Sequence, residues 1–236
     1  MCTVTFLPAA DRFYITSNRD ESPSRQAKGL YSNHHLGFFP IHYPLDESSQ
    51  GSWIALSESG RAVCLLNGAF EPFVPAPSYR LSRGQVVMAA AREDRIQEFI
   101  DHFAFDGIAP FTLLVFEAEM FVELVWDGFK KHIRDLNPDQ PQLWSSVTLY
   151  PPEVRAWRRS IFKSWLQDHP VFDQESIIAF HQMKPGDGHN DFIMNRNEVV
   201  KTLSVTSIVM KPTSGRMLHL DLEKNIREEV LIRYGE

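Results

Sequence analysis

Short apolar segments of strand length dominate the first third of the chain. Residues 3–7 and 13–17 are rich in β-branched and aromatic side chains, so they predict an N-terminal hairpin. Residues 52–56 and 61–66 flank a Ser-Glu-Ser-Gly connection and predict a second hairpin. The polar stretch at 22–50 has no sustained period, and we expect a long loop that carries functional groups there.

Apolar positions three and four residues apart then predict helices. Residues 81–103 have this spacing around a charged Arg-Glu-Asp-Arg segment, and residues 152–166 begin with proline, which is favourable at a helix start. The apolar stripe of the second helix consists of Val154, Trp157, Ile161 and Trp165. The remaining predicted elements are a hairpin at 111–116 and 120–126, a short helix at 174–181, a turn at 185–191 and a strand at 203–210.

The order of these elements predicts the fold class. Blocks of strands and blocks of helices alternate along the chain, which is typical of a layered α+β protein. Most neighbouring strands are joined as hairpins, so the sheets should be mainly antiparallel. No linker rich in proline and serine divides the chain, and we therefore expect one domain over residues 1–236.

Composition and charge exclude several classes of protein. The 236 residues are 43% hydrophobic and 23% charged, as is usual for a globular protein. A net charge of −6 argues against general binding of nucleic acids or anionic membranes, which requires a basic surface. The longest apolar runs, such as 111–116, are far too short for a membrane helix, and no signal peptide is evident. Only Cys2 and Cys64 are present, so we expect a soluble protein of a reducing, cytoplasmic compartment.

Cys2 is the candidate nucleophile. Removal of Met1 is expected because the next side chain is small, and it would expose a thiol beside a free α-amine. An α-amine has an ordinary pKa of about 7.7–8.0, so it can act as the general base for that thiol. The alternative is that Cys2 is an ordinary second residue at a chain end with no part in catalysis. Cys64 lies within an apolar strand and is expected to be a core residue.

Polar groups at two predicted strand ends are candidates to act with the thiol. Directly after the second predicted strand come Asn18, Arg19, Asp20 and Glu21. An arginine there can stabilise a thiolate or orient a carbonyl, and an aspartate can hold the new amino terminus. Asn67 closes a later strand, where its amide can donate to an oxyanion. The alternatives are a solvated turn with a local ion pair for the tetrapeptide and an Asn-Gly hairpin turn for Asn67.

The histidines do not predict a metal site. His34, His35 and His42 lie in the long loop, but no HExxH or HxH pattern is present, and a metal usually needs three or four ligands. The Gly-rich turn at 186–191 lacks the spacing of a calcium-binding loop, and Gly-rich phosphate motifs are absent from the sequence. We therefore expect no metal and no cofactor.

Together these motifs resemble those of a known family. The Met-Cys start, the tetrapeptide at 18–21, the Gly-Ser-Trp-Ile segment at 51–54 and the Leu-Asn pair at 66–67 are similar to the NRDE family, also called the transport and Golgi organisation protein 2 family. The resemblance is clear over residues 1–70 and weaker beyond them. It implies the fold of N-terminal nucleophile hydrolases, an αββα sandwich in which two mainly antiparallel sheets lie between helical layers.

The resemblance also implies roles for particular residues. The cysteine-nucleophile relatives are choloylglycine hydrolases and penicillin V acylases, which cleave non-peptide amide bonds. By this resemblance Cys2 is both nucleophile and base. Arg19 and Asp20 match the arginine and aspartate of those enzymes, and Asn67 matches an asparagine of the oxyanion hole. The residues expected to contact the substrate are Asn18, Glu21 and Trp53.

Three departures from the family pattern bear on catalysis. The arginine and aspartate are three positions apart in the acylases but adjacent here, and adjacent strand residues face opposite sides of a sheet. Ser146 occupies the place of a second asparagine and offers one hydroxyl donor. Leu203 stands where a late arginine is expected, with Arg196 nearby as a substitute. Each lost oxyanion donor would remove about 2.7–4 kcal/mol of transition-state stabilisation.

Two specific functions remain open. The first is an amidohydrolase that cleaves a non-peptide amide through an acyl-cysteine intermediate. The second is a non-catalytic protein that binds haem or an acyl lipid on the same fold, with Cys2 or the loop histidines as axial ligands. In both cases the partner is a small molecule rather than a nucleic acid. The hydrolase is our working hypothesis, because a generic structural domain would not explain why Cys2 and the polar tetrapeptide at 18–21 occur together.

Overall fold

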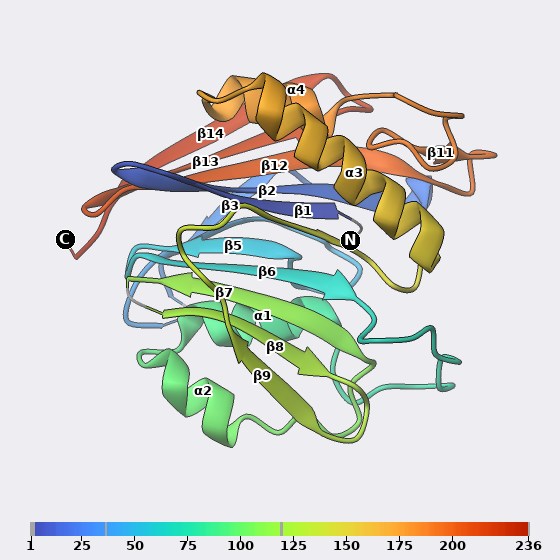
Figure 1. Ribbon diagram of the computed structural model, residues 1–236. Helices are drawn as coiled ribbons and strands as arrows, with labels where there is room; N and C mark the ends of the chain where they lie inside the picture. The colour runs from blue at the N-terminus through green and yellow to red at the C-terminus, as the bar shows by residue number, and fades with distance from the viewer. Residues whose placement is uncertain (1–2, 36, 119, 236) are drawn as a thin grey trace.

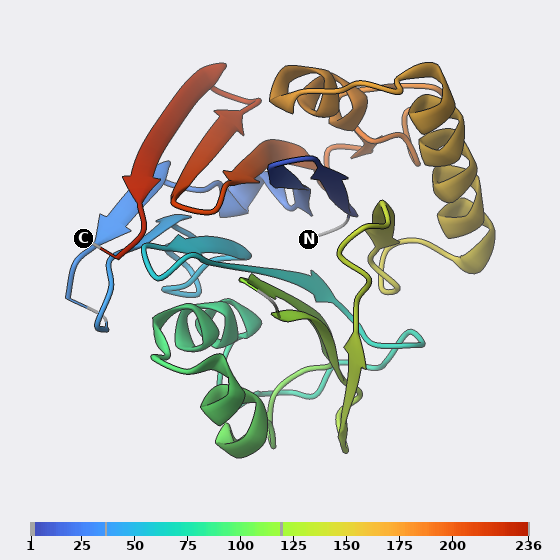
Figure 2. The same ribbon diagram turned by 60° about the vertical axis from the view of Figure 1, so that its left-hand side comes forward.

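The protein is a four-layer sandwich. The structure, a computed structural model, describes residues 3–35, 37–118 and 120–235. Two β-sheets stack face to face, and helices cover the outer side of each sheet (Figure 1). Turning the molecule by 60° shows the two pairs of helices on opposite sides of the sheets (Figure 2). This arrangement confirms the predicted α+β class and its αββα layering.

Sheet A combines the N-terminal hairpin with the C-terminal part of the chain. Its strands, in spatial order, are β10 (Gln142–Ser145), β1 (Thr3–Ala9), β2 (Arg12–Glu21), β12 (Val200–Met210), β13 (Ser214–Asp221) and β14 (Ile226–Arg233), with the short β11 (Asn195–Arg196) paired to β12. All these pairs are antiparallel. The hairpin of β1 and β2 was predicted, whereas β10, β13 and β14 were not.

Sheet B is a meander in which each strand pairs with the next along the chain. Its strands are β3 (Leu30–Asn33), β4 (Ile41–Pro44), β5 (Ile54–Ser57), β6 (Arg61–Asn67), β7 (Phe111–Glu117), β8 (Met120–Trp126) and β9 (Lys131–Asp135). The prediction of a continuous loop at 22–50 is therefore wrong, because β3 and β4 lie within it, after a short 3₁₀ turn at Pro23–Arg25. Strands of four residues are too short to give a recognisable period.

Two helices pack on each sheet. The helices α1 (Arg83–Arg92) and α2 (Ile96–His102) cover sheet B, and α3 (Pro152–Asp168) and α4 (Gln174–His181) cover sheet A. The single helix predicted at 81–103 is thus two helices. Arg61 of β6, which is fully buried, donates to the carbonyl oxygens of Ala90, Glu93 and Asp94 at the break. Such donors stabilise a helix end, because its last carbonyl groups have no partner within the helix.

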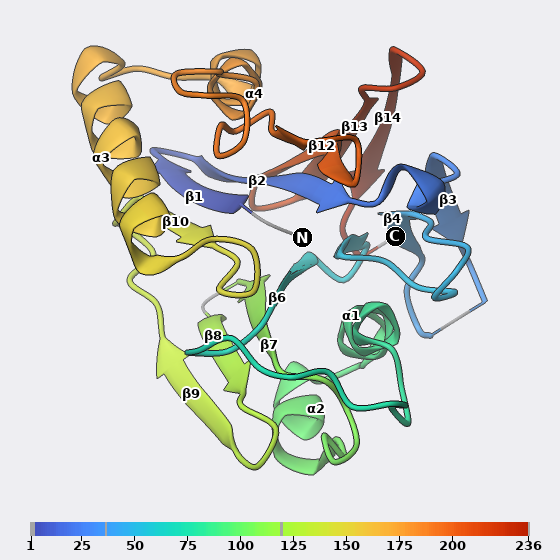
Figure 3. The same ribbon diagram turned by 90° about the vertical axis from the view of Figure 1, so that its right-hand side faces the viewer.

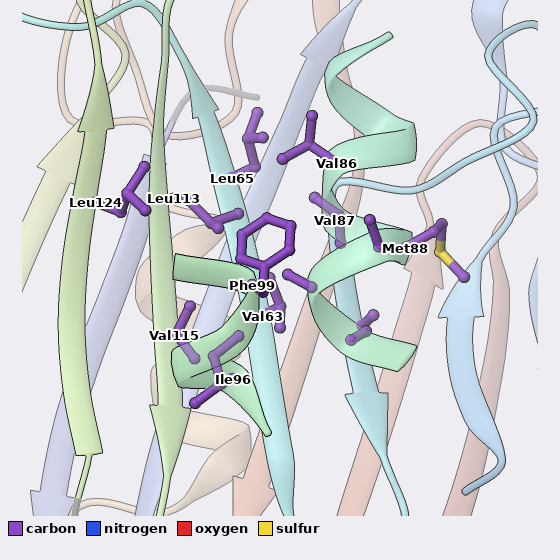
Figure 4. Close-up of a cluster of buried hydrophobic side chains, with 14 of the residues drawn as sticks. Val63, Leu65, Val86, Val87, Met88, Ile96, Phe99, Leu113, Val115 and Leu124 are labelled. Carbon is purple, nitrogen blue, oxygen red and sulfur yellow. The ribbon is translucent and has the colours of Figure 1, made fainter. Parts of the chain in front are cut away.

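Three apolar clusters hold the layers together. Figure 4 shows the cluster between sheet B and its helices, in which Val63 and Leu113 of the sheet face Val87 of α1 and Phe99 of α2. A second cluster fills the space between the sheets, and a third lies under α3 and α4. The buried face of α3 consists of Arg158, Phe162 and Trp165. This differs from the predicted stripe, because an arginine occupies a position at the centre of the buried face.

Several strand ends meet at one end of the sandwich. Figure 3 faces this end, where β6 ends and α1 begins. Strand β1 begins here and β2, β6 and β10 end here, since Thr3 pairs with both Asn18 and Ser145. Within the described part of the chain, no helix is both long enough and apolar enough to cross a membrane.

Candidate active site

A pocket of about 330 Å³ opens at this end of the sandwich. Its lining includes four residues expected from the sequence to act on a substrate, Arg19, Glu21, Trp53 and Asn67. The other lining residues are Arg25, Asp46, Ser49, Ser52, Leu65, Tyr79, Leu81, Ser82, Arg83, Gly84 and Ala109, and we call the whole the Arg19 pocket. Larger hollows of about 540 and 780 Å³ elsewhere contain none of the predicted site residues.

The Asn-Arg-Asp-Glu tetrapeptide forms the last four residues of β2 rather than a segment after it. Its side chains therefore alternate between the two faces of sheet A. Arg19 and Glu21 line the Arg19 pocket between the sheets, whereas Asn18 and Asp20 face α3 and α4. The prediction that the strand ends before Asn18 is wrong, because β12 pairs with β2 as far as Glu21.

Arg19 is buried and held from two sides. Its Nη2 donates to Asp46 Oδ2 at 3.0 Å, and its Nη1 donates to the carbonyl oxygen of Arg25. The guanidinium carbon lies 4.6 Å from the centre of the Trp53 ring, within the range of a cation–π contact. Burial lowers the pKa of Arg19 below its usual value, and Asp46 opposes this change. The side chain is thus a fixed cation in the wall of the pocket.

Asp20 lies on the opposite face of the same strand. Its Oδ2 accepts a hydrogen bond from the Tyr150 hydroxyl at 2.7 Å, and its Oδ1 accepts one from Thr202 Oγ1 at 2.6 Å. The ladder between β12 and β2 shifts register between Thr202 and Ser204, directly opposite the Asp20–Arg19 pair. The extra residue of this irregularity lies in β12, and the side chains of Arg19 and Asp20 remain on opposite faces of β2.

Asn18 lies outside the Arg19 pocket and is fully buried. Its Nδ2 donates to the carbonyl oxygens of His181 and Phe192, at 2.9 and 2.8 Å, and its Oδ1 accepts from His181 Nδ1. His181 Nε2 lies 2.8 Å from Thr5 Oγ1, and burial lowers the pKa of His181 to about 3, which keeps the imidazole neutral. Because its polar atoms bind α4 and its neighbours, Asn18 does not meet the expectation of a substrate contact.

Asn67 ends β6 and lines both the Arg19 pocket and an adjoining hollow of about 160 Å³. Among the described residues its side-chain amide has no hydrogen-bond partner. Its carbonyl oxygen accepts from Ser146 Oγ at 2.8 Å. Gly68 follows with φ of +88°, and a Cβ there would lie 2.9 Å from Thr148. The strand end is therefore fixed while the amide remains available to a ligand.

Ser146 does not reach the site as a free donor. Its single hydroxyl proton is used on the Asn67 carbonyl, and its oxygen also lies 2.9 Å from Thr148 Oγ1. Ser146 lines the adjoining hollow and not the Arg19 pocket. These contacts therefore favour a role for Ser146 in supporting Asn67, rather than the expected role as an oxyanion donor.

Two arginines that sequence reasoning missed or left open lie against Tyr150, whose hydroxyl binds Asp20. Arg158 of α3 is fully buried, donates to Thr3 Oγ1 and stacks 3.7 Å from the centre of the Tyr150 ring. Arg196 lies 5.4 Å from the same ring. Leu203, where an arginine was expected, is a buried apolar residue. The one sequence signal for Arg158 was its place on the apolar face of α3.

Cys2 lies outside the described residues, so its predicted position beside Asn67 stays a prediction. Its neighbour Thr3 is buried at the start of β1, between Asn18 and Ser145. Cys64 is fully buried, and burial raises the pKa of its thiol to about 12. An inert core thiol at this position agrees with the expectation for Cys64.

The loop histidines do not gather around the Arg19 pocket. His42 is buried, with Nδ1 2.8 Å from Ser32 Oγ and Nε2 2.9 Å from Glu58 Oε1. Both ring nitrogens are therefore occupied. Over residues 3–35, 37–118 and 120–235, no three His, Cys, Asp or Glu side chains group so that they could hold a metal ion.

The fold is that of the N-terminal nucleophile hydrolases. A mutant of the conjugated bile acid hydrolase from Clostridium perfringens superposes with a TM-score of 0.59 at 9% identity, covering 100% of this chain and 97% of that one. An N-acylethanolamine-hydrolyzing acid amidase orthologue from Caenorhabditis elegans gives 0.57 at 14% identity, covering 87% and 92%. The penicillin V acylase from Agrobacterium tumefaciens gives 0.56 at 10% identity, covering 98% and 86%. At these identities the likeness establishes the fold alone.

Sequence comparison gives the family. None of the curated proteins matches the chain. The family model described as Transport and Golgi organisation 2 matches residues 1–147, which is more than half of the chain. This matched region contains both strands of the N-terminal hairpin, Trp53 and Asn67. The protein therefore belongs to the Transport and Golgi organisation 2 family.

Proposed function

We propose that this protein is an amidohydrolase that uses the thiol of Cys2 to cleave a non-peptide amide through an acyl-cysteine intermediate. The observation that carries the proposal is the convergence of Arg19, Trp53 and Asn67 on one pocket. This pocket lies at the end of the sandwich where β1 begins, and Thr3, the residue bonded to Cys2, pairs there with Asn18, the neighbour of Arg19. A pocket of about 330 Å³ suits a small molecule.

The proposed reaction begins with proton transfer from the Cys2 thiol to its own α-amine. The sulfur then forms a bond to the amide carbonyl carbon, and the carbonyl electron pair moves onto oxygen. As the tetrahedral intermediate collapses, the C–N bond breaks and the departing nitrogen takes the proton from the α-ammonium group. Water then attacks the acyl thioester, releasing the acid and restoring the thiol.

The residues of the pocket would act on the charges that develop in this reaction. The free amide of Asn67 would donate to the oxyanion, a contribution of about 2.7–4 kcal/mol for one such donor. The Arg19 cation would favour the thiolate over the thiol. Asp20, already held by Tyr150 and Thr202, would bind the α-ammonium group from the other face of β2. Ser146 would position Asn67.

The alternative of a haem carrier has less support. His34, His35 and His42 do not line the Arg19 pocket, and both ring nitrogens of His42 are engaged. An acyl-lipid carrier would need a pocket lined mainly by apolar side chains, whereas polar and charged residues predominate here. With two cysteines 62 positions apart, we also propose a reducing, cytoplasmic location and one domain for the whole chain.

The experiment that tests the function is a hydrolysis screen with matched cysteine variants. Wild type, Cys2→Ala and Cys64→Ala are each incubated with short- and medium-chain N-acyl aminocoumarins, and coumarin release is followed by fluorescence. We expect wild type and Cys64→Ala to release coumarin and Cys2→Ala to fall to the background rate. Equal rates in wild type and Cys2→Ala would overturn the proposal.

A further inference from the structure

A serine, a histidine and a carboxylate are joined by hydrogen bonds outside the Arg19 pocket. His42 Nδ1 lies 2.8 Å from Ser32 Oγ, and His42 Nε2 lies 2.9 Å from Glu58 Oε1. None of the three residues lines the Arg19 pocket or the hollow beside Asn67. A hydroxyl, an imidazole and a carboxylate joined in this order are the groups of an acyl-transfer triad, in which the carboxylate orients the base that activates the hydroxyl.

Glu58 determines which ring nitrogen of His42 carries the proton. A carboxylate only accepts hydrogen bonds, so the neutral imidazole has its proton on Nε2 and donates it to Glu58. Nδ1 is then the acceptor, and the Ser32 hydroxyl donates to it. In the serine proteases the hydroxyl binds Nε2 and the carboxylate binds Nδ1, so the two nitrogens exchange roles here. The serine proton nevertheless points at a base, which a nucleophilic hydroxyl requires.

The pairing of β3 with β4 brings the serine and the histidine together. Ser32 is directly opposite His42 in this antiparallel ladder. The N–H of Leu30 donates to Glu228 rather than to β4, so Leu30 belongs to a pair without ladder hydrogen bonds, and so does Ser32 two residues later. Side chains are closest in such pairs, and the Ser32 hydroxyl therefore reaches the imidazole.

The backbone of Glu58 is held in place from two sides. Its N–H donates to the carbonyl oxygen of Pro40, just before β4, at 3.0 Å, and its own carbonyl oxygen accepts from the N–H of Gly235 at 3.2 Å. Glu58 directly follows β5, which pairs with β4 through His42 and Leu56. All three groups of the triad therefore stand on one fixed part of sheet B.

The base of this triad is buried and its nucleophile is accessible. His42 is 4% exposed, whereas Ser32 lies on the surface. Strand β3 is at the edge of sheet B, and in the pair without ladder hydrogen bonds the N–H of Ser32 points to this open edge. The N–H of the nucleophilic serine is also one of the oxyanion donors in the serine proteases.

Two other hydroxyl–imidazole pairs in the described part of the chain differ from this one. Thr5 with His181 and Thr206 with His219 have all four side chains buried, so no substrate reaches either hydroxyl. The second ring nitrogen of His181 binds the Asn18 amide instead of a carboxylate. These pairs have structural contacts only, whereas Ser32 combines an accessible hydroxyl with a base that a carboxylate orients.

We propose that Ser32, His42 and Glu58 form a second nucleophilic centre, separate from Cys2, which cleaves short carboxylic esters through an acyl-serine intermediate. Ser32 Oγ bonds to the ester carbonyl carbon while His42 Nδ1 takes its proton and the carbonyl electron pair moves onto oxygen. The C–O bond to the alcohol then breaks, and the alcohol oxygen takes the proton from Nδ1. Water attacks the acyl-serine with the same assistance, and the acid and the free hydroxyl are restored.

The position of the triad favours esters over amides. An exposed edge strand with one backbone donor stabilises an oxyanion less than an enclosed site with several donors, so the leaving group must be a good one. An alcohol or phenol oxygen leaves more readily than an amine nitrogen. The short acyl group follows from the open surface around Ser32, where a long chain finds no enclosing wall.

Labelling with a small fluorophosphonate tests the serine directly. In this reaction Ser32 Oγ displaces fluoride from phosphorus while His42 accepts the hydroxyl proton, and peptide mass mapping reports the rate at each serine. The protein carries Cys2→Ala, so the Cys2 site contributes nothing. We expect Ser32 to be labelled at least 100-fold faster than Ser48, an exposed serine in the turn after β4, because general-base assistance contributes about 10²- to 10⁴-fold.

Two substitutions of the triad partners test the cause of this reactivity. His42→Gln removes the base and should slow the labelling of Ser32 at least 100-fold. Glu58→Gln removes the negative charge that stabilises the imidazolium, and we expect at least a tenfold loss. Glu47→Gln is the matched control, since this exposed carboxylate pairs only with Lys28 at the surface. His42 is buried, so Glu58→Gln decides the question if His42→Gln does not fold.

Hydrolysis of 4-nitrophenyl acetate tests turnover in the same Cys2→Ala background. We expect Ser32→Ala to lower the release of nitrophenolate at least tenfold, and what remains is hydrolysis by exposed histidines such as His34. Labelling of Ser32 no faster than that of Ser48, or unchanged in Glu58→Gln, overturns the proposed triad. Equal nitrophenolate release with and without Ser32 overturns ester cleavage. None of these outcomes bears on the Cys2 hydrolase, because Cys2 is absent from every protein compared.

Discussion

Asn67 combines a fixed backbone with a side chain that has no partner among the described residues. Ser146 holds its carbonyl oxygen, and Gly68 at φ +88° turns the chain away at once. Positioning a donor in advance is how proteins stabilise an oxyanion, since no reorganisation is then needed during the reaction. In the proposed mechanism, oxyanion stabilisation by a side-chain amide therefore depends on Asn67, because Ser146 stands in the place of a second asparagine.

Asn67→Ala tests that donor. We expect kcat/KM for a cleaved N-acyl aminocoumarin to fall about 10²- to 10³-fold, because one preorganised donor is lost. The rate at which iodoacetamide alkylates Cys2 should stay at the wild-type value, since Asn67 acts on the oxyanion and not on the thiol. A fall in both rates by the same factor would instead indicate that Asn67 shapes the whole site.

Ser146→Ala tests whether Ser146 supports Asn67 or takes part directly in catalysis. The variant loses one neutral hydrogen bond to the Asn67 carbonyl, so urea titration should show a loss of about 1 kcal/mol in the free energy of unfolding. We expect the turnover rate to change less than tenfold, much less than in Asn67→Ala. If the turnover rate instead falls a hundredfold or more, the Ser146 hydroxyl has a direct role at the oxyanion.

At the scale of elements, β2 presents different chemistry on its two faces. Arg19 and Glu21 point between the sheets, and Asn18 and Asp20 point under the helical layer. Tyr150 joins the second face to α3, because its hydroxyl binds Asp20 while its ring packs 3.7 Å from the Arg158 guanidinium. The Tyr150 side chain therefore links a buried cation to a buried carboxylate.

Tyr150→Phe removes the hydroxyl that donates to Asp20. Because the acceptor is charged and buried, we expect a loss of about 1.5–3 kcal/mol in the free energy of unfolding. Tyr31→Phe, at a residue that is 48% exposed, is the control and should change stability by less than about 0.5 kcal/mol. Equal stabilities of wild type and Tyr150→Phe in urea would contradict the importance of this contact.

The buried His181, which joins α4 to sheet A, predicts that the stability of the protein depends on pH. Burial lowers the pKa of His181 to about 3, whereas an unfolded histidine titrates near about 6.5. Below that value the unfolded chain binds a proton that the folded protein does not, so stability falls as the pH decreases toward 3. For one such histidine, the free energy of unfolding changes by roughly 1 kcal/mol per pH unit.

In His181→Gln, the free energy of unfolding should fall less steeply between pH 6 and 4, by roughly 1 kcal/mol per pH unit, as measured by urea unfolding at each pH. His219 contributes in the same direction, because burial lowers its pKa to about 4, and its share should remain in the variant. His102, which is exposed near the end of α2, provides the control. An unchanged slope in His181→Gln would show that His181 becomes protonated in the folded protein.

At the scale of the whole molecule, local pattern explains which elements were predictable. The hairpins and the helices at 152–166 and 174–181 have clear periods and were found, because period 2 and period 3.6 are local properties. The strands β9, β13 and β14 were missed, since many of their residues are polar or exposed. No local pattern indicates that a strand near residue 200 pairs with β2.

The candidate site was predictable only in part, for a related reason. The apolar pattern of the chain placed Arg19 and Asn67 near the ends of strands, and the fold brings them to one pocket. It did not indicate which face of β2 each polar residue occupies, because that depends on where the strand ends. Arg158 was overlooked because a fully buried arginine is rare, and because its hydrogen-bond partners, Thr3 and residues 190–191, are distant in the sequence.

Acylation followed by mass spectrometry shows whether Cys2 is an activated N-terminal nucleophile, as we propose. Native protein is exposed briefly to p-nitrophenyl hexanoate, quenched in acid and mapped by peptide mass. We expect an N-terminal peptide that begins at Cys2 and carries one hexanoyl group, slower acylation in Arg19→Ala, and an unmodified Cys64, because burial raises the pKa of its thiol to about 12. A peptide that begins with Met1 and carries an unmodified Cys2 would show that Cys2 is not an N-terminal nucleophile.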